Sequence, residues 1–177
     1  MAKWTIDSDH SVAAFSVRHM MIANVRGQFN RISGTIYFDP VKIDKSSLEV
    51  TVDASSILTG IQKRDEHLKS PDFFNVVKYP DITFKSIQID HAKGDLVKVT
   101  GEMTLHGVTR QITVAATFIG PVKDPFGDDK SMGFSTSFII NLDDYGISWN
   151  QPMENNGLLI GREVLLFIDL EADMVSE

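Results

Sequence analysis

Residues Ser131–Leu142 read SMGFSTSFIINL, and large apolar side chains alternate here with small or polar ones. Because successive side chains of a strand point to opposite faces of a sheet, this alternation predicts a strand with one buried face. At about 3.3 Å per residue the stretch spans about 40 Å, well beyond the average strand of about 5–6 residues. Strands of this length favour a closed barrel, whose interior could hold a ligand. The side chains on the buried face are Met132, Phe134, Thr136, Phe138, Ile140 and Leu142.

Similar alternation recurs along the chain, and turn residues such as Asp39-Pro40 and His106-Gly107 separate the segments. The short connections favour antiparallel pairing and argue against a parallel, doubly wound sheet. Within Ile82–Asp90 the alternation changes phase, which predicts a β-bulge near Ser86. The sequence therefore predicts an all-β fold with the strands Lys3–Ile6, Ser11–His19, Asn24–Phe29, Ser33–Phe38, Ser47–Ala54, Asp81–Asp90, Leu96–Leu105, Thr109–Gly120, Ser131–Leu142 and Glu163–Met174.

One segment departs from the strand pattern. Thr59-Gly60-Ile61-Gln62 fits a capping box, with Thr59 as the N-cap of a short helix that runs to about Leu68. Ser70 and Pro71 then predict the start of a second short helix. We therefore expect short helices inserted around residues 60–76.

Two of the predicted strands, Ser11–His19 and Glu163–Met174, are apolar on both faces. A strand of this kind must be covered on both sides. We expect the helical segment to cover these strands on the outside and the barrel interior to cover them on the inside.

Composition limits the classes of function. The chain has 177 residues and is predicted to form a single domain, residues 1–177. A formal charge of -7 argues against nucleic acid and against anionic membrane surfaces as partners. The absence of cysteine excludes disulfides and thiolate metal sites.

The sequence contains no apolar run long enough for a transmembrane segment, since the longest aliphatic or aromatic run is Val164–Ile168. The start of the sequence has no apolar stretch of secretory type, so we expect a cytoplasmic protein. A leader that had been removed and replaced by a new Met1 would look the same, which leaves the periplasm open.

Motifs for nucleotide chemistry are missing from the sequence. Gly133-Phe134-Ser135-Thr136-Ser137 begins like a nucleophile elbow, but it lies within a predicted strand and lacks the second glycine. The five histidines do not have the spacing of a metal site. We therefore expect no cofactor and no metal. A barrel of about eight strands can be filled by its own side chains or can hold one small ligand, and both outcomes stay open at this point.

Short motifs follow one another in a defined order along the chain. They are Trp4-x-Ile6-Asp7-x-x-His10-Ser11, Phe15-x-Val17-x-His19-Met20, Val25-x-Gly27-x-Phe29, Thr59-Gly60, Arg64-Asp65-x-His67-Leu68-x-Ser70-x-Asp72-Phe73-Phe74, Tyr79-Pro80, Phe84-x-Ser86, the run from Gly101 to Thr109, and Asp144-Tyr145-Gly146-Ile147. The ordered set resembles the YceI-like family of lipid-binding proteins, from Trp4 to about Ala172.

The resemblance implies an extended, eight-stranded antiparallel β-barrel of lipocalin-like type with an elongated apolar lumen. It also implies a polyisoprenoid or another long-chain amphiphile as ligand, and a homodimer. The sequence departs from the family pattern at Leu142, where the family usually has arginine, and at Met103, where it has leucine. Many family members carry a secretory leader, which this sequence lacks.

Our main hypothesis is a non-enzymatic protein that carries or sequesters a long-chain isoprenoid or fatty lipid. His19, Arg64 and His67 are candidates for contact with a head group at the barrel entrance, although Arg64, Asp65 and His67 could equally fasten the short helix. The predicted lining residues are Phe15, Val17, Ile36, Phe38, Val50, Phe84, Met103, Leu105, Phe118, Phe134, Phe138, Leu166 and Ile168.

Two alternatives remain open. The first is an enzyme acting on a small amphiphile, with His67, Asp65 or His19 as acid–base groups; a histidine paired with a carboxylate at an open lumen would favour it. The second is a filled, ligand-free barrel that acts through protein contacts in a stress response. Met20-Met21-Ile22 could form an apolar lip at the opening or a buried plug.

Overall fold

The computed structural model describes residues 1–127 and 129–175 of the chain. Ten strands and one short α-helix make up most of it, and the strands form one continuous antiparallel sheet. The strands are β1 (Ala2–His19), β2 (Ala23–Phe29), β3 (Ile32–Phe38), β4 (Ser47–Asp53), β5 (Ile57–Leu58), β6 (Asp81–Lys93), β7 (Leu96–Leu105), β8 (Val108–Lys123), β9 (Lys130–Asn141) and β10 (Ile160–Met174). The helix is α1 (Gln62–Lys69), and 3-10 turns lie at Ile43–Lys45, Ala54–Ser56 and Leu142–Tyr145.

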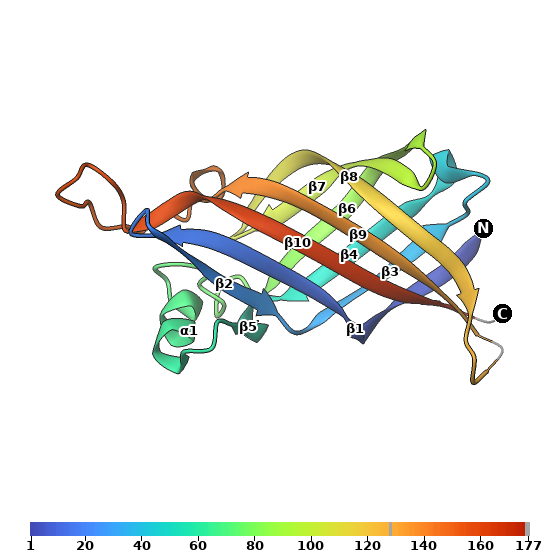
Figure 1. The fold of residues 1–177 in the computed structure, drawn as a ribbon, viewed down its shortest axis with the longest axis horizontal. Coiled ribbons are helices and arrows are strands. Elements are labelled where there is room, and N and C mark those ends of the chain that lie inside the picture. The colour runs from blue at the N-terminus through green and yellow to red at the C-terminus, as the bar shows by residue number, and fades with distance from the viewer. Residues whose placement is uncertain (128, 176–177) are drawn as a thin grey trace.

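The sheet closes into a barrel because β1 pairs with β10 (Figure 1). The closed ring has eight strands, which follow one another as β1, β3, β4, β6, β7, β8, β9 and β10. This confirms the predicted eight-stranded antiparallel barrel. The first part of β1 pairs with β3 and the later part with β2, to which the short β5 is added.

Two irregularities in the strands have clear local causes. The predicted strands Lys3–Ile6 and Ser11–His19 form the single strand β1, in which the pairing with β10 shifts between Asp7 and Val12. The β-bulge predicted in β6 is confirmed between Ser86 and Gln88. There the Ser86 hydroxyl accepts a hydrogen bond from the backbone N–H of Leu48 at 2.9 Å.

The segment between β5 and β6 contains one α-helix rather than two. The capping box predicted Thr59 as the N-cap of this helix, but the N-cap is Ile61. Thr59 instead donates two hydrogen bonds to the Asp65 carboxylate, from its N–H at 2.9 Å and from its hydroxyl at 2.5 Å. Ser70 ends α1 instead of starting a second helix, because its N–H and its hydroxyl both donate to the His67 carbonyl. Residues 71–78 form turns.

The expectation that this segment covers the outside of β1 and β10 is wrong. α1 packs beside β5 at one end of the barrel (Figure 1). On the outer face, Phe167 of β10 is 40% exposed and Ile139 of the neighbouring β9 is 59% exposed. The apolar outer faces of β9 and β10 are therefore open to solvent.

Side chains close the opposite end of the barrel, where β1 begins and β10 ends (Figure 1). The Phe38 ring meets the Phe118 ring at a centroid distance of 4.9 Å and the Phe134 ring at 5.4 Å. The Trp4 indole donates a hydrogen bond to the Phe38 carbonyl, and Met132 is 1% exposed. This packing makes the two ends of the barrel different.

Two glycines on the strands allow a matched test of how tightly neighbouring strands of the barrel pack. A Cβ atom on Gly101 would lie 2.5 Å from the Lys85 carbonyl and would also meet the Phe84 ring, whereas a Cβ on Gly133 would meet nothing within 4 Å. We expect Gly101→Ala to lower the free energy of unfolding by about 1–3 kcal/mol, because backbone must move. Gly133→Ala should leave it almost unchanged. Urea unfolding of both variants measures the difference, and equal effects would contradict it.

Candidate functional site

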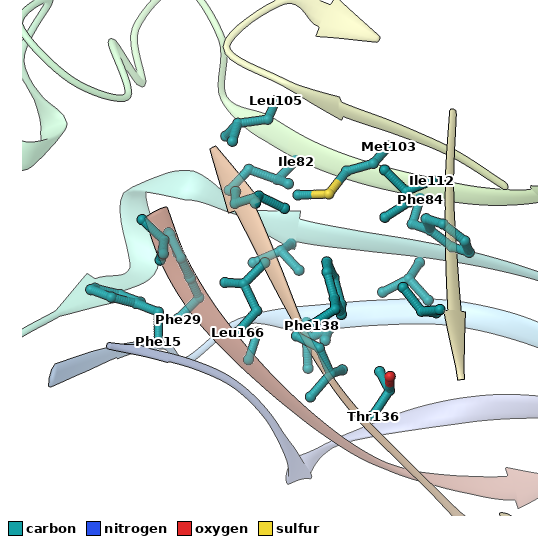
Figure 2. Close-up of a pocket in the computed structure, with 18 of the residues that line it drawn as sticks. Phe15, Phe29, Ile82, Phe84, Met103, Leu105, Ile112, Thr136, Phe138 and Leu166 are labelled. Carbon is teal, nitrogen blue, oxygen red and sulfur yellow. The ribbon is translucent and has the colours of Figure 1, made fainter. Parts of the chain in front are cut away.

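An elongated cavity of about 400 Å³ runs inside the barrel (Figure 2). Side chains from all eight barrel strands line it, and almost all of them are apolar. The volume lies within the range of about 300–1,000 Å³ that is usual for small-molecule sites. The interior of the barrel therefore has room for a ligand.

The predicted lining residues lie on the cavity wall with the single exception of Phe118. Phe118 faces the interior but is buried against Phe38 in the closed end, so it supports the cavity floor rather than the wall. The residues that do line the cavity are Phe15, Val17, Ile36, Phe38, Val50, Phe84, Met103, Leu105, Phe134, Phe138, Leu166 and Ile168. Their contact with a ligand stays a prediction.

The side chains that line the cavity do not fill the barrel interior. Phe84, Phe138 and Leu166 point into the barrel (Figure 2), yet each keeps part of its side-chain surface accessible. Their exposed surface faces the cavity. The alternative of a barrel filled by its own side chains is therefore wrong.

Aromatic residues outside the barrel strands also line the cavity, and the strand pattern did not reveal them. Phe73 and Phe74 come from the turns after α1, and Trp149 follows β9. The Phe74 ring meets Phe29 at 5.4 Å and the Phe73 ring meets Trp149 at 5.2 Å between centroids. The run of aromatic residues at 73–74 was the available signal, but it has no strand periodicity.

The charged and imidazole side chains of the cavity lie at the α1 end, and the other polar side chains on the wall are the hydroxyl residues Thr83, Ser135 and Thr136. Deep inside, the Thr136 hydroxyl donates a hydrogen bond to the Ala115 carbonyl at 2.7 Å, which leaves its methyl group for the cavity. The charged or imidazole side chains on the wall are Arg18, His19, Arg64 and His67. The three predicted head-group candidates therefore lie together at the open end, with Arg18 as an addition that the sequence did not indicate.

Arg64 and Asp65 both fasten α1 to the end of β5. Arg64 donates from Nε to the Thr59 hydroxyl and from Nη2 to the Thr59 carbonyl, each at 2.7 Å. Asp65 is 7% exposed and accepts from the same threonine. Arg64 and Asp65 therefore fasten the short helix, as one of the two sequence-based alternatives predicted. Arg64 also lines the cavity.

His67 has a different environment. Its Nε2 atom is 2.7 Å from Oδ2 of Asp72, and its ring packs edge-on against Trp149 at 4.9 Å and Phe73 at 5.1 Å. The ring is thereby held at the cavity entrance. The enzyme hypothesis asked for a histidine–carboxylate pair at this place, and the partner is Asp72 rather than Asp65.

The turn between β1 and β2 projects beside the entrance. The N–H of Met20 donates to the Leu159 carbonyl at 2.7 Å, and Leu159 lines the cavity. Met21 is 49% exposed and Ile22 is 77% exposed. These residues form an exposed apolar lip, and the buried-plug alternative is wrong.

Leu142, where the family pattern usually has arginine, is buried and lines the cavity. A cationic side chain at the 3-10 turn Leu142–Tyr145 belongs to Arg162 of β10. Arg162 donates hydrogen bonds to Oδ1 of Asp143 at 2.9 Å and to the Ile147 carbonyl. The cavity wall is therefore apolar at residue 142.

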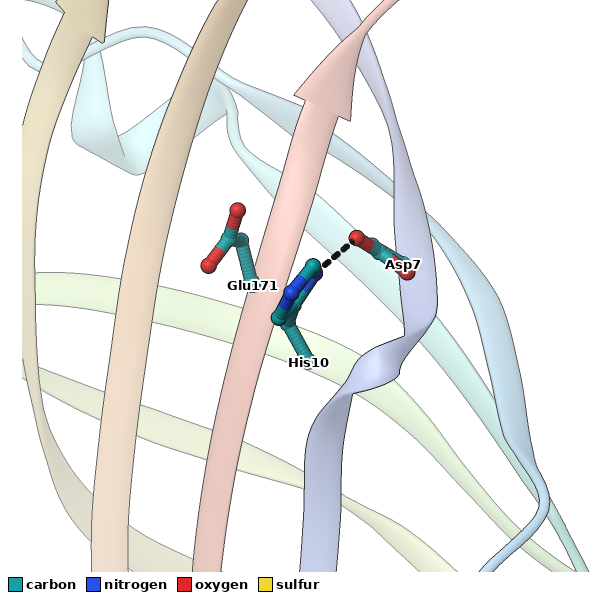
Figure 3. Close-up of side chains that lie close together, drawn as sticks. All are labelled: Asp7, His10 and Glu171. Atoms are coloured by element: carbon teal, nitrogen blue, oxygen red, sulfur yellow. Dashed lines mark hydrogen bonds and ion pairs between the residues drawn. The ribbon is translucent and has the colours of Figure 1, made fainter. Parts of the chain in front are cut away.

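A second cluster of polar side chains lies on the outside of the barrel, at the irregularity in β1 (Figure 3). Donor atoms of Asp7, His10 and Glu171 all lie within 4.8 Å of one another, a donor set that a divalent cation can use. Asp7 already holds His10, with Nδ1 2.6 Å from Oδ2. Sequence spacing missed this cluster because Glu171 comes from the other end of the chain.

The pairing shifts the pKa values of both partners. The hydrogen bond to His10 lowers the pKa of Asp7 below 3.8, against a smaller desolvation effect. The hydrogen bond to Asp7 raises the pKa of His10 above 6.5, and the charges of Asp7, Glu171 and Asp9 add to this shift. Both partners are therefore predominantly ionised between pH 3.8 and pH 6.5.

A pH dependence of stability follows. The stabilisation from His10 is fully present below pH 6.5 and is lost as the pH rises through its raised pKa. The stabilisation from Asp7 is present above pH 3.8 and is lost as the pH falls through its lowered pKa. We expect His10→Gln to lower the urea midpoint more at pH 5.5 than at pH 8.5. A His10→Gln effect that does not change with pH would contradict the assignment.

Together, the closed antiparallel barrel and its elongated apolar cavity define a barrel of lipocalin-like type. The chain belongs to the YceI-like family: the model of the YceI-like domain matches residues 4–172. A UPF0312 protein of Pseudomonas savastanoi pv. phaseolicola is 36% identical over 153 residues, covering 85% of this chain and 79% of the relative.

Solved structures show the same fold. The Campylobacter jejuni YCEI protein is 31% identical, with a TM-score of 0.74 and 90% of each chain covered. A Saccharophagus degradans protein described as a polyisoprenoid binding domain has a TM-score of 0.73 at 18% identity, covering 99% of this chain and 100% of the neighbour. At that identity the likeness concerns the fold alone. Within the described residues, no helix has the length and apolar character needed to cross a membrane.

Proposed function

We propose that the protein binds a long-chain polyisoprenoid or a similar amphiphilic lipid in its cavity and carries or sequesters it. The observation that supports this most directly is the cavity itself, an elongated space of about 400 Å³ with an almost wholly apolar wall. Burial of an apolar chain contributes about 25 cal/mol per Å² of surface removed from water. Such a wall can hold a long chain with few polar contacts.

The orientation of the ligand follows from the difference between the two ends. The end near Phe38 and Phe118 is closed by packed rings, so the chain terminus would point there. The end near α1 carries the polar side chains, so the head group would remain there. The polyisoprenoid-binding description of the Saccharophagus degradans neighbour is consistent with this proposal.

A second candidate function is an enzyme on a small amphiphile, favoured by the His67–Asp72 pair at the entrance. Asp72 could orient the imidazole for proton transfer. Asp65 is a poor candidate for this chemistry because its carboxylate accepts hydrogen bonds from the N–H and the hydroxyl of Thr59. We place the carrier first because the apolar wall extends far beyond these two residues.

Two adjacent alanines of β8 separate the cavity from the outer surface. Ala116 lines the cavity, while Ala115 is exposed on the other face. We expect Ala116→Phe to abolish stoichiometric binding of a long prenyl chain, because the ring takes up part of the cavity, and Ala115→Phe to retain it. Organic extraction of each loaded protein followed by mass spectrometry measures the bound lipid.

The same extraction distinguishes the two functions. A carrier returns the added lipid chemically unchanged, whereas an enzyme returns a product that disappears in Asp72→Asn. If the unaltered protein neither contains lipid nor takes up added prenyl chains, the carrier proposal fails.

We further propose a homodimer, formed through the open outer face of β9 and β10. Ile139, Leu165 and Phe167 form an apolar strip there, since Leu165 pairs with Ile139 and Phe167 lies two residues further along β10. Phe167→Ser should increase the fraction of monomer in light scattering after size exclusion. Ile87→Ser, at an exposed apolar residue of β6, is the matched control. Equal masses for all three proteins would contradict this interface.

A further inference from the structure

We infer that the cavity selects amphiphiles with an anionic head group, a carboxylate or a phosphate, and that Arg18 is the main side chain that recognises the charge. The inference rests on the proposed function, because it requires an apolar chain in the cavity. It adds the chemical class of the head group and a residue that recognises it.

The charge on the cavity wall has one sign. Among the described residues, Arg18 and Arg64 line the cavity, and no aspartate or glutamate does. This is the reverse of the whole chain, which has 24 acidic and 17 basic residues. His19 and His67 add hydrogen-bond donors at the same end. A local excess of cationic donors on an acidic protein favours an anionic group at this entrance.

Arg18 lies at the rim of the cavity, beside an irregularity in the pairing of β1 with β10. Val17 faces Val164 and His19 faces Ile160, so the additional residues of this irregularity lie on β10. Val17, Arg18 and His19 all line the cavity. Arg18 also remains exposed to solvent, which places it at the mouth of the cavity rather than deep inside. Gly161 allows the close approach, since a Cβ there would lie 3.0 Å from Cβ of Arg18.

Arg18 is available for a ligand. Its side chain makes no hydrogen bond or ion pair within the described structure, while its backbone belongs to the pairing of β1 with β2. The acidic side chains near the entrance are already engaged, since Asp72 holds His67 and Asp65 holds Thr59. A guanidinium group offers two parallel N–H donors to a carboxylate or phosphate, a geometry that a hydroxyl head group does not match.

Arg64 contributes in a different manner. Two of its nitrogen atoms, Nε and Nη2, hold the Thr59 hydroxyl and carbonyl, so the side chain is fixed before any ligand arrives. Its remaining Nη1 atom can donate to a head group from the α1 side. A change at Arg64 would also loosen α1, and Arg18 is therefore the better residue to test.

The experiment compares ligands that differ only in the head group. Geranylgeranyl phosphate is compared with geranylgeraniol, and hexadecanoate with hexadecanol, in direct binding titrations below the micelle concentration. We expect the wild-type protein to bind each anion about tenfold more tightly than its alcohol, because charge-assisted hydrogen bonds form only with the anion. The pair with the larger ratio of anion affinity to alcohol affinity identifies phosphate or carboxylate as the better head group.

Arg18→Gln should remove most of the preference for the anion while leaving the affinity for the alcohol unchanged. Arg26→Gln is the matched control: it removes the same charge from an exposed side chain of the neighbouring β2, which does not line the cavity. The control should keep the full preference. In the wild-type protein, raising the salt concentration should reduce the preference without changing alcohol binding.

Equal affinity of the wild-type protein for anions and alcohols overturns the inference and leaves lipid binding intact. Equal loss in Arg18→Gln and Arg26→Gln also overturns it, because the effect would then be one of net charge. If none of the four ligands binds, the proposed function itself fails. Urea midpoints of both variants equal to the wild-type value show that the comparison is between folded proteins.

Discussion

The pairing of β1 with β10 is the interaction on which the rest of the structure depends. It runs from Trp4 beside Met174 to His19 beside Ile160, and it joins the first strand of the chain to the last. Without it the sheet would have two open edges, and its inner apolar face would be exposed to water. The inner faces of both strands form part of the barrel wall, and the outer face of β10 carries the exposed Phe167.

The two ends of the barrel are built differently. At one end Phe38, Phe118 and Met132 pack to high burial, and this end needs no additional element. At the other end the chain adds β2, β5, α1 and the turns that carry Phe73 and Phe74. Thr59 joins β5 to α1 in this segment, because the Arg64 and Asp65 side chains of α1 both form hydrogen bonds with it.

The histidines show how position decides chemistry in this fold. His10 lies outside the barrel, and its pairing with Asp7 bears on stability and its pH dependence. His67 is held by Asp72 on the cavity wall, where the same type of pair lies within reach of the cavity. The cationic entrance, the apolar wall and the closed floor are successive sections of one cavity, and they match the parts of an amphiphile.

Alternation alone determined which side of each regular strand faces inward, because the period of a strand is two. For this reason Phe84, Phe134, Phe138 and Leu166 could be assigned to the cavity wall from the sequence. Residues outside the strands, such as Phe73 and Trp149, follow no such period, and their places depend on contacts between distant segments. Whether the barrel is filled or hollow was decided only by tertiary structure, since the space inside depends on how the closed strands set their inward side chains against one another.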